Sequence, residues 1–215
     1  MSKLDHLVVA VDDLEQSIDA FAAATGVRPV VGGRHEGLGT WNALVALGDD
    51  VYLELLAKDP TRESIECSSW LGVADCTSGL GRLTTYCVRV SPDKVDDRFR
   101  SCSRKKNDGS ILEWQLDVAS HAYPHVAQLP NMGTSPFRIN WCQSEHPALT
   151  APKGCSLISL EIMASLPDGS QVAELIYGDG KLFEGTAFSP KLPSDCDDLR
   201  LRATLRTCKG EVVIQ

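Results

Sequence analysis

The sequence predicts an α+β protein assembled from repeated units of one helix and several strands. Three observations lead to this fold class. A strand, a helix and three more strands are expected in that order over residues 1–57, a similar order starts again at Leu83, and a fainter one at Leu157. Such repetition indicates modules that bury their sheets against each other, because one unit of this size cannot cover its own apolar face.

The first unit begins with a strand and a helix. The run from Leu4 to Val11 is densely apolar and is interrupted by His6, which predicts a strand that carries one polar side chain. Asp12-Asp13 then offers capping side chains, and apolar residues recur at helical spacing from Leu14 to Thr25. Gly26 stands where a left-handed residue would end this helix.

Three strands complete the first unit. A short strand is expected from Arg28 to Val31, and the glycine-rich stretch from Gly32 to Gly39 predicts a loop. Two further strands are expected from Trp41 to Leu47 and from Val51 to Ala57, because Gly48-Asp49-Asp50 between them is a good hairpin signal. The first unit therefore has the order β, α, β, β, β.

The second unit is expected to repeat this order. A strand is predicted from Thr84 to Val90 and a helix from Pro92 to Cys102, since proline suits the first turn of a helix. Strands are predicted from Ile111 to Val118 and from Pro136 to Cys142, where apolar residues gather.

The third unit is the faintest. A strand is predicted from Leu157 to Met163 and a short helix from Ser170 to Tyr177. A final hairpin is expected from Arg200 to Thr207 and from Glu211 to Gln215, with its turn at Lys209-Gly210. The predicted division of one compact unit is a first module at 1–57, a connector at 58–82, a second module at 83–150 and a third, partial module at 151–215.

The charge of the chain argues against a nucleic-acid partner. The 215 residues carry a formal net charge of −8, and no basic stripe would neutralise several phosphates. The one basic cluster, Arg104-Lys105-Lys106, comes directly before Asn107-Asp108-Gly109, a strong turn sequence. This cluster is therefore predicted to be the solvated tip of a hairpin.

Membrane and disulfide-rich classes are also not expected. No apolar run is long enough to span a bilayer, and the N-terminus enters a strand without the features of a signal peptide. The eight cysteines are scattered singly and none forms a C-x-x-C pair, which argues against zinc-finger and thioredoxin-like sites. These observations predict a soluble, cytoplasmic protein.

Several blocks of the sequence together resemble a known family. They are Leu4-Asp5-His6-Leu7-Val8-Val9-Ala10-Val11, Gly32-Gly33-Arg34-His35 with Gly37, Gly39 and Asn42, Val51-Tyr52-Leu53-Glu54-Leu55, Pro136-Phe137-Arg138-Ile139-Asn140-Trp141 with Glu145-His146-Pro147, and Leu205-Arg206-Thr207-Cys208-Lys209-Gly210. The pattern resembles the glyoxalase-like domains of the vicinal oxygen chelate (glyoxalase/bleomycin resistance/dioxygenase) superfamily. The resemblance implies βαβββ modules whose curved mixed sheets enclose an open cavity.

The resemblance also implies a metal site. Metal-dependent members hold the metal with a residue on the first strand and another on the fourth strand of a module, and His6 and Glu54 stand at those positions. Imidazole and carboxylate suit a divalent ion such as Zn, Fe, Mn, Ni or Mg. The chemistry that would follow is that of an isomerase, lyase or dioxygenase acting on vicinal oxygens, with Glu54 as ligand or catalytic base.

Other features leave a metal-free alternative open. When the later units are laid over the first, Thr85 and Ser159 stand opposite His6, and Gln215 stands opposite Glu54. None of these three is a strong metal ligand. The alternative is a protein that binds or sequesters a small molecule without catalysis.

Glu54 needs a partner in either case. It lies between Leu53 and Leu55, and a buried carboxylate requires a cation, a metal or hydrogen-bond donors. Arg34, Arg138 or His6 would serve as a purely structural partner.

The predicted ligand is a small polar or carbonyl-bearing molecule. Its expected contacts are His35, Asn42, Arg138 and Trp141, although His35 and Asn42 would also suit a structural role in the loop and Trp141 a place in the core. His146 precedes Pro147 and is expected to form a turn. Besides the small molecule, a second copy of the chain is a possible partner, which would make the protein a homodimer.

Overall fold

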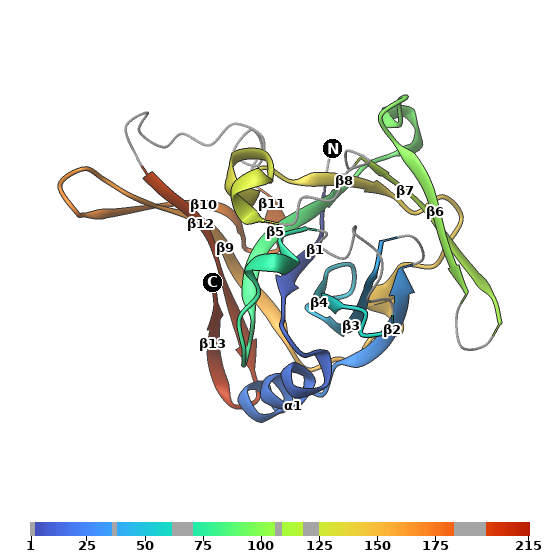
Figure 1. The fold of residues 1–215 in the computed structure, drawn as a ribbon, viewed down its shortest axis with the longest axis horizontal. Helices are drawn as coiled ribbons and strands as arrows, with labels where there is room; N and C mark the ends of the chain where they lie inside the picture. The colour runs from blue at the N-terminus through green and yellow to red at the C-terminus, as the bar shows by residue number, and fades with distance from the viewer. Residues whose placement is uncertain (1–2, 36–37, 62–70, 106–108, 118–124, 183–196) are drawn as a thin grey trace.

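Two β-sheets and one α-helix make up the described part of this computed structural model, which comprises residues 3–35, 38–61, 71–105, 109–117, 125–182 and 197–215 (Figure 1). Short 3-10 helices lie in the connections: η1 (Val73–Asp75), η2 (Pro92–Lys94), η3 (Val126–Gln128), η4 (Pro130–Gly133) and η5 (Pro147–Leu149). Among the described residues, no helix has the length and apolar character needed to cross a membrane.

The first sheet has eight strands in the order β2-β3-β4-β1-β5-β8-β7-β6. They are β1 (Lys3–Ala10), β2 (Val30–His35), β3 (Thr40–Ala46), β4 (Tyr52–Lys58), β5 (Arg82–Arg89), β6 (Arg100–Lys105), β7 (Ile111–Asp117) and β8 (Phe137–Asn140). β1 pairs with β4 in parallel and β5 pairs with β8 in parallel, whereas β1 and β5 are antiparallel. The sheet therefore consists of a first half (residues 3–58) and a second half (residues 82–151) with the same strand order, joined between β1 and β5.

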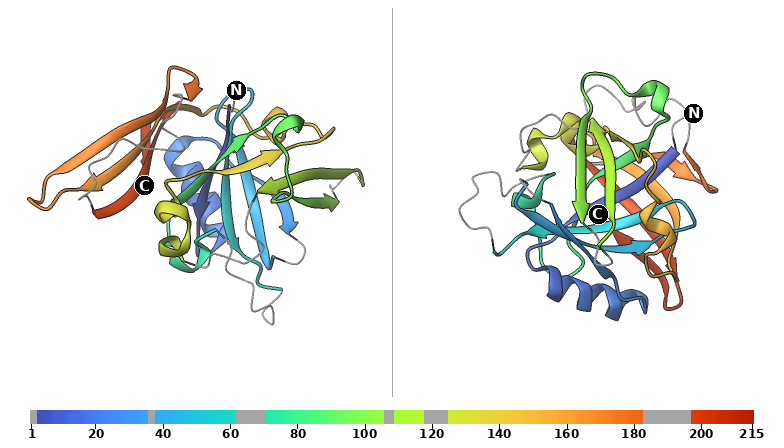
Figure 2. Two further views of the ribbon diagram at one scale, coloured as in Figure 1. Left: turned by 90° about the horizontal axis from the view of Figure 1, so that it is seen from above. Right: turned by 90° about the vertical axis from the view of Figure 1, so that its right-hand side faces the viewer.

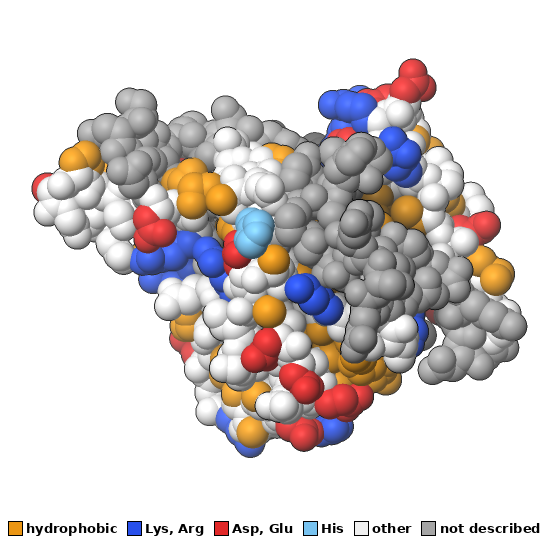
Figure 3. All heavy atoms as spheres, in the orientation of Figure 1, with side chains coloured by type: hydrophobic (Ala, Val, Ile, Leu, Met, Phe, Trp, Pro, Cys, Tyr) orange, Lys and Arg blue, Asp and Glu red, His pale blue; other side chains and the backbone are white. Residues whose placement is uncertain are grey.

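The helix α1 (Leu14–Thr25) follows β1, as the sequence predicts. The side chain of Asp13 accepts a hydrogen bond from the backbone N–H of Gln16, and Gly26 adopts a left-handed conformation with φ of 80°. Glu15 and Asp19 are exposed on this helix. Acidic side chains gather on the surface at its end of the molecule (Figure 3). That face carries a charge of the wrong sign for binding phosphates.

Two of the predicted elements in the first sheet are wrong. The stretch predicted to be a loop continues β2 through Gly32 to His35, because these residues pair with β3. The predicted helix from Pro92 to Cys102 stops after η2, and the chain then becomes β6. The reason is local: Val95 is extended at the end of η2, and the Asp96 carboxylate accepts a hydrogen bond from the backbone N–H of Arg98, which turns the chain.

The third unit forms a separate antiparallel sheet in the order β11-β10-β9-β12-β13. Its strands are β9 (Ser156–Ser165), β10 (Gln171–Gly178), β11 (Lys181–Leu182), β12 (Asp197–Thr207) and β13 (Gly210–Ile214). The predicted final hairpin is confirmed as β12 and β13. The predicted helix from Ser170 to Tyr177 is wrong, because β10 pairs with β9 and its partly or fully buried residues, Val172, Glu174 and Ile176, alternate with exposed ones as in a strand.

The alternation of side chains on β1 separates two cores. Leu7 and Val9 join the core that the first sheet shares with α1 and the second sheet, and Phe21 lies in the same cluster. Val8 and Ala10 belong to a second core on the opposite face of the first sheet. The two sheets form distinct layers (Figure 2), and the first sheet curls until its outermost strands, β2 and β6, contact each other. This curl encloses the second face.

Candidate functional site

A cavity of about 440 Å³, counting its open mouth, lies within the curled first sheet. The first half lines it mainly with polar side chains, namely His6, His35, Asn42, Tyr52 and Glu54, together with Leu44. The second half lines it mainly with apolar side chains, namely Leu112, Trp114, Leu116, Phe137, Ile139, Trp141 and Pro147, together with Arg104. The sequence-based expectation of a cavity beside His6 and Glu54 therefore agrees with the arrangement.

A β-bulge at the start of β1 places two polar residues side by side. Leu4 pairs with Val88 but His6 pairs with Cys87, so Asp5 is the extra residue in β1. Leu4 and Leu7 both face the core between the sheets. Asp5 and His6 consequently both turn toward the cavity side, which a regular strand would not allow.

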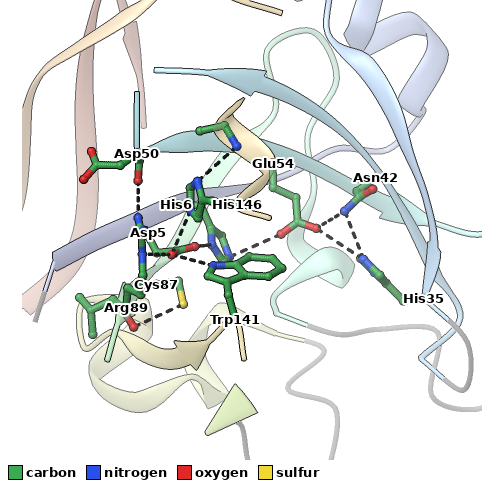
Figure 4. A network of polar contacts seen from close by, with 12 residues as sticks. Asp5, His6, His35, Asn42, Asp50, Glu54, Cys87, Arg89, Trp141 and His146 are labelled. Carbon is green, nitrogen blue, oxygen red and sulfur yellow. Dashed lines mark hydrogen bonds and ion pairs between the residues drawn. The ribbon is translucent and has the colours of Figure 1, made fainter. Parts of the chain in front are cut away.

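The carboxylate of Asp5 is fully buried and accepts four hydrogen bonds (Figure 4). Oδ1 accepts from Nδ1 of His6 at 2.7 Å, and Oδ2 accepts from Nε of Arg89 at 2.9 Å, Nε1 of Trp141 at 2.9 Å and Nε2 of His146 at 3.2 Å. Burial alone would raise the pKa of Asp5, but the hydrogen bonds from His146 and His6 outweigh it and hold the pKa far below its usual range. Asp5 is thus an anchor between the two halves, and its oxygens are already engaged.

His6 is oriented by this anchor. In the neutral tautomer that donates from Nδ1 to Asp5, the Nε2 atom carries the lone pair, and it faces Oε2 of Glu54 at 3.8 Å. Tyr52 stacks on the imidazole with ring centroids 4.6 Å apart, and Phe137 meets it edge-on at 5.4 Å. A carboxylate behind a histidine in this way is the usual arrangement behind metal-binding imidazoles.

Glu54 is held on its other side by neutral groups. Oε1 accepts a hydrogen bond from Nδ2 of Asn42 at 2.6 Å, and Nε2 of His35 lies 3.7 Å away. Asn42 also donates to His35 Nε2 at 3.2 Å, so His35 uses Nδ1 to donate to Thr40 at 2.9 Å. Burial lowers the pKa of His35, which the Glu54 carboxylate partly opposes. His35 is therefore a neutral neighbour of Glu54.

The prediction that Arg104 belongs to the solvated tip of a hairpin is wrong. It lies on β6 of the second half, but its side chain lines the cavity and Nη1 donates to Oδ1 of Asn42 at 3.3 Å. Gly32 and Gly33 of β2 leave room for it, because a Cβ on Gly32 would lie less than 3.0 Å from Arg104 Nη1. Arg104 therefore reaches across the point where the two edges of the sheet meet. Lys106 lies outside the described residues.

The structure brings most of the predicted site residues together, with one exception. His6, Glu54, His35, Asn42 and Trp141 line one cavity, and they meet in the arrangement that Figure 4 shows. Arg138 is not part of that lining. Its Nε donates to Oδ2 of Asp117 at 2.6 Å and its guanidinium lies over the Phe99 ring at 5.0 Å.

The proposed structural partners of Glu54 also differ from expectation. Arg34 forms an ion pair with Asp59 and Arg138 forms one with Asp117. Of the three candidates, only His6 lies beside Glu54.

None of the three residues that the comparison of units matched with the pair lines the cavity. Thr85 lies buried on β5, the strand of the second half that corresponds to β1. Ser159 belongs to the separate second sheet, where it pairs with Gly178 and Thr204, so it does not line the cavity. Gln215 follows β13 of the same sheet and is exposed. The third unit could not supply matching ligands because it does not repeat the topology of the first.

Asp5, His6 and Cys87 form the metal-compatible cluster found among the described residues, with ligand atoms within 4.8 Å of one another. Two of the three are poor ligands. Asp5 already accepts four hydrogen bonds, and burial raises the pKa of the Cys87 thiol, which favours the protonated form. The pair of His6 and Glu54 is the better candidate.

Three residues of this site were missed by sequence reasoning as functional neighbours: Asp5, Arg104 and His146. His146 does form the predicted turn, since its Nδ1 accepts from the backbone N–H of Ala148, but its Nε2 also reaches Asp5. A signal for Asp5 was present, because a carboxylate in a densely apolar strand needs donors. No local signal marks Arg104 or its target.

Comparisons with solved structures give low overall similarity. A methylmalonyl-CoA epimerase from Mycobacterium tuberculosis is 19% identical over 64% of this chain and 85% of its own, with a TM-score of 0.38. A methylmalonyl-CoA epimerase in complex with methylmalonyl-CoA and NH4+ is 16% identical over 68% of this chain and 99% of its own, with a TM-score of 0.39. A hypothetical protein from Bacillus halodurans is 13% identical over 67% of this chain and 98% of its own, with a TM-score of 0.38.

The family is shown by a different comparison. No match is found among curated proteins. A family model described as a glyoxalase-like domain matches residues 4–176, which include β1 to β9 and most of β10. That span contains every residue of the cavity described above. The chain therefore belongs to the family of glyoxalase-like domains.

Proposed function

We propose that this protein binds a small carbonyl-bearing molecule in the cavity and transfers a proton on it, with a divalent metal held by His6 and Glu54. One observation carries the proposal. His6 Nε2 and Glu54 Oε2 face each other at 3.8 Å, and a neutral His6 that donates from Nδ1 to Asp5 presents a lone pair at Nε2. In that tautomer two acceptor atoms face and repel each other, and a divalent ion between them would satisfy both.

The donor set fits a first-row divalent ion. Bonds from such an ion to imidazole nitrogen and carboxylate oxygen are about 2.0 to 2.2 Å each, so one ion could contact both of these atoms, which are 3.8 Å apart. The cavity leaves the remaining coordination positions to oxygens of the bound molecule or to water. When bound, the metal would polarise a carbonyl oxygen.

The side chains around Glu54 supply the rest of the chemistry. Glu54 is the only carboxylate among the described residues that line this cavity, which makes it the group available to take a proton. The Asn42 amide holds Oε1 at 2.6 Å and so fixes the direction of Oε2. Trp114, Phe137 and Ile139 exclude water from the opposite wall.

The proposal is tested first by metal content. Elemental analysis after loading with Zn, Fe, Mn, Ni or Mg is expected to give close to one equivalent for the wild type and for the control His125→Ala, a change in an exposed histidine outside the cavity. His6→Ala and Glu54→Ala are expected to lose the metal. Equal metal in His6→Ala and the wild type would contradict the assignment.

Proton transfer is tested separately with Glu54→Gln. The probe is hydrogen–deuterium exchange of pyruvate in D2O, followed by NMR. The wild type is expected to accelerate exchange at the methyl carbon, and Glu54→Gln is expected to lower that rate about 100-fold or more. An unchanged rate in Glu54→Gln would remove Glu54 from the role of base.

A second candidate function is metal-free binding. It is favoured by the neutral and cationic donors that surround Glu54, since Asn42, His35 and Arg104 would hold a polar ligand without a metal. Ligand binding by a protein that takes up no metal in the loading experiment would support this candidate over the first.

A further inference from the structure

A second cavity adjoins the one that holds His6 and Glu54. It occupies about 970 Å³, counting open solvent, and it shares Leu44, Arg104, Leu112 and Pro147 with the first. Its remaining lining consists of Val30, Val31, Gly32, Glu145, Thr150 and Ala151. The two cavities are therefore neighbouring chambers of one site, with Arg104 on their common wall.

Arg104 is incompletely paired at this wall as far as the described residues are concerned. Its one hydrogen bond to a described residue is the 3.3 Å contact from Nη1 to Asn42, and Nε is buried with no acceptor among the described residues. No carboxylate of the described residues forms an ion pair with it. Because the Arg104 side chain lines both cavities, its guanidinium is placed to pair with the two oxygens of a carboxylate bound there.

The second cavity, which we call the outer cavity, differs in its lining from the inner cavity that holds His6 and Glu54. Most of its lining is apolar, and Val30 and Val31 on β2 remain 47% and 40% exposed although they are large hydrophobic residues. Glu145 is its one acidic residue among the described lining, and it would repel a second anion. The outer cavity therefore suits the uncharged, apolar part of a ligand.

Arg104 is also close to the reacting end. Its Nη1 contacts Oδ1 of Asn42, whose Nδ2 contacts Oε1 of Glu54, so a single amide group separates the guanidinium from the carboxylate of Glu54. A molecule that pairs with Arg104 through a carboxylate would therefore have its acid end one amide group away from Glu54.

From these observations we infer the substrate class: a small monocarboxylic acid whose carboxylate pairs with Arg104 and whose apolar chain extends into the outer cavity. This inference rests on the proposed function for the position of the reacting carbonyl. The binding of the acid itself depends only on Arg104 and the outer cavity. The two can therefore fail independently.

The test measures binding of butanoate, hexanoate and hexanamide to the purified 215-residue chain by titration calorimetry. Hexanoate is expected to bind at least tenfold more tightly than the uncharged hexanamide. Each added methylene from butanoate to hexanoate is expected to tighten binding about fourfold. Equal affinity for hexanoate and hexanamide in the wild type would overturn the inference.

Variants assign these effects to the residues. Arg104→Gln is expected to remove the preference for the acid, whereas Arg100→Gln, an exposed arginine on the same strand, is expected to retain it. Thr150→Trp, an exposed change in the outer lining, is expected to abolish the gain with chain length and to leave the preference for acid over amide. A preference that persists in Arg104→Gln would overturn the role of Arg104.

Two further measurements keep the outcomes distinct. If circular dichroism shows that Arg104→Gln does not fold, Arg104→Lys takes its place, because lysine keeps the charge but lacks the paired N–H edge and is expected to lose most of the preference. Metal content of the same samples separates the two proposals. Metal without acid binding contradicts only the substrate class, and acid binding without metal contradicts only the metal-assisted function.

Discussion

The two halves of the first sheet share a strand order but differ in chemistry. The order β1-β4-β3-β2 of the first half matches β5-β8-β7-β6 of the second. The first half places His6, His35, Asn42 and Glu54 in the cavity, whereas the second half contributes an apolar wall and one cation, Arg104. The helix α1 follows β1, but only the short η2 follows β5. The two halves therefore have similar backbones, and a few side chains decide what each half contributes to the cavity.

The largest expected effect tests whether the halves are bound together by Asp5. Asp5→Asn replaces a carboxylate that accepts four hydrogen bonds, three of them from Arg89, Trp141 and His146 of the second half. The buried donors would lose their anion, so the free energy of unfolding in urea is expected to fall by about 3 to 5 kcal/mol. The control Asp19→Asn removes an exposed ion pair with Arg28 and is expected to cost less than about 1 kcal/mol. Similar losses in both variants would show that Asp5 is not the link between the halves.

The next effect concerns the place where the second half reaches into the first. In Gly32→Ala the new Cβ would lie less than 3.0 Å from Asn42 Oδ1 and Arg104 Nη1, so one of them must move. We expect a loss of about 1 to 3 kcal/mol in the free energy of unfolding. Gly48→Ala is the matched control, because no heavy atom lies within 4 Å of its Cβ position. Tolerance of Gly32→Ala equal to that of Gly48→Ala would contradict the contact between the halves.

The third effect is a pH dependence of the free energy of unfolding, which we expect from His35 in the polar first half. Burial lowers the pKa of His35 in the folded protein, whereas the unfolded value is about 6.5. Below pH 6.5 the unfolded chain therefore binds a proton that the folded chain does not, and stability falls as pH decreases toward the folded pKa. Between pH 7.5 and 5.5 this contribution is expected to reach about 1.4 kcal/mol at most.

The check is the slope of unfolding free energy against pH. His35→Gln is expected to flatten this slope relative to the wild type, whatever its stability at pH 7.5. His125→Gln, which changes an exposed histidine, serves as the control and is expected to keep more of the wild-type slope than His35→Gln. A wild-type slope in His35→Gln would show that His35 does not become protonated upon unfolding.

The smallest effect concerns the helix that distinguishes the first half. Asp13→Ala removes the side chain that accepts from the backbone N–H of Gln16 at 3.0 Å. We expect a loss of about 1 kcal/mol in the free energy of unfolding. Asp93→Ala, an exposed change in η2 of the second half, is expected to cost less, because no α-helix starts there. An equal loss in both variants would contradict the difference between the halves.

The sequence predicted the first half well because its signals are local and strong. The apolar run of β1, the cap at Asp13, the helical spacing up to Thr25 and the hairpin near Gly48 each specify their own segment. The Pro92 to Cys102 helix failed because the proline begins only one short turn, and the residues after it alternate as in a strand. The prediction of a helix from Ser170 to Tyr177 failed because pairing with β9 decides the conformation of β10.

The site was predictable only in part. His6 and Glu54 could be named because they stand at the ligand positions that the resemblance to glyoxalase-like domains implies, and each is a polar residue in an apolar strand. Their separation of 3.8 Å follows from the parallel pairing of β1 and β4. The contact of Asp5 with His146 joins residues 141 positions apart and depends on the bulge in β1. Whether the side chain of Arg104 reaches the cavity depends on how far the sheet curls. Neither bulge nor curl has a signal that a pattern of residue types reveals.

The meeting of β2 and β6 also affects how the chain behaves in concentrated solution. Edge strands of an open sheet expose unpaired N–H and C=O groups that can pair with another molecule and start aggregation. Here the two edges of the eight-stranded sheet lie against each other, and Arg104 crosses from one to the other over Gly32 and Gly33. Arg34 on β2 and Arg100 on β6 further discourage the approach of a like strand. The side chain that shapes the cavity thereby also protects the sheet against edge-to-edge association.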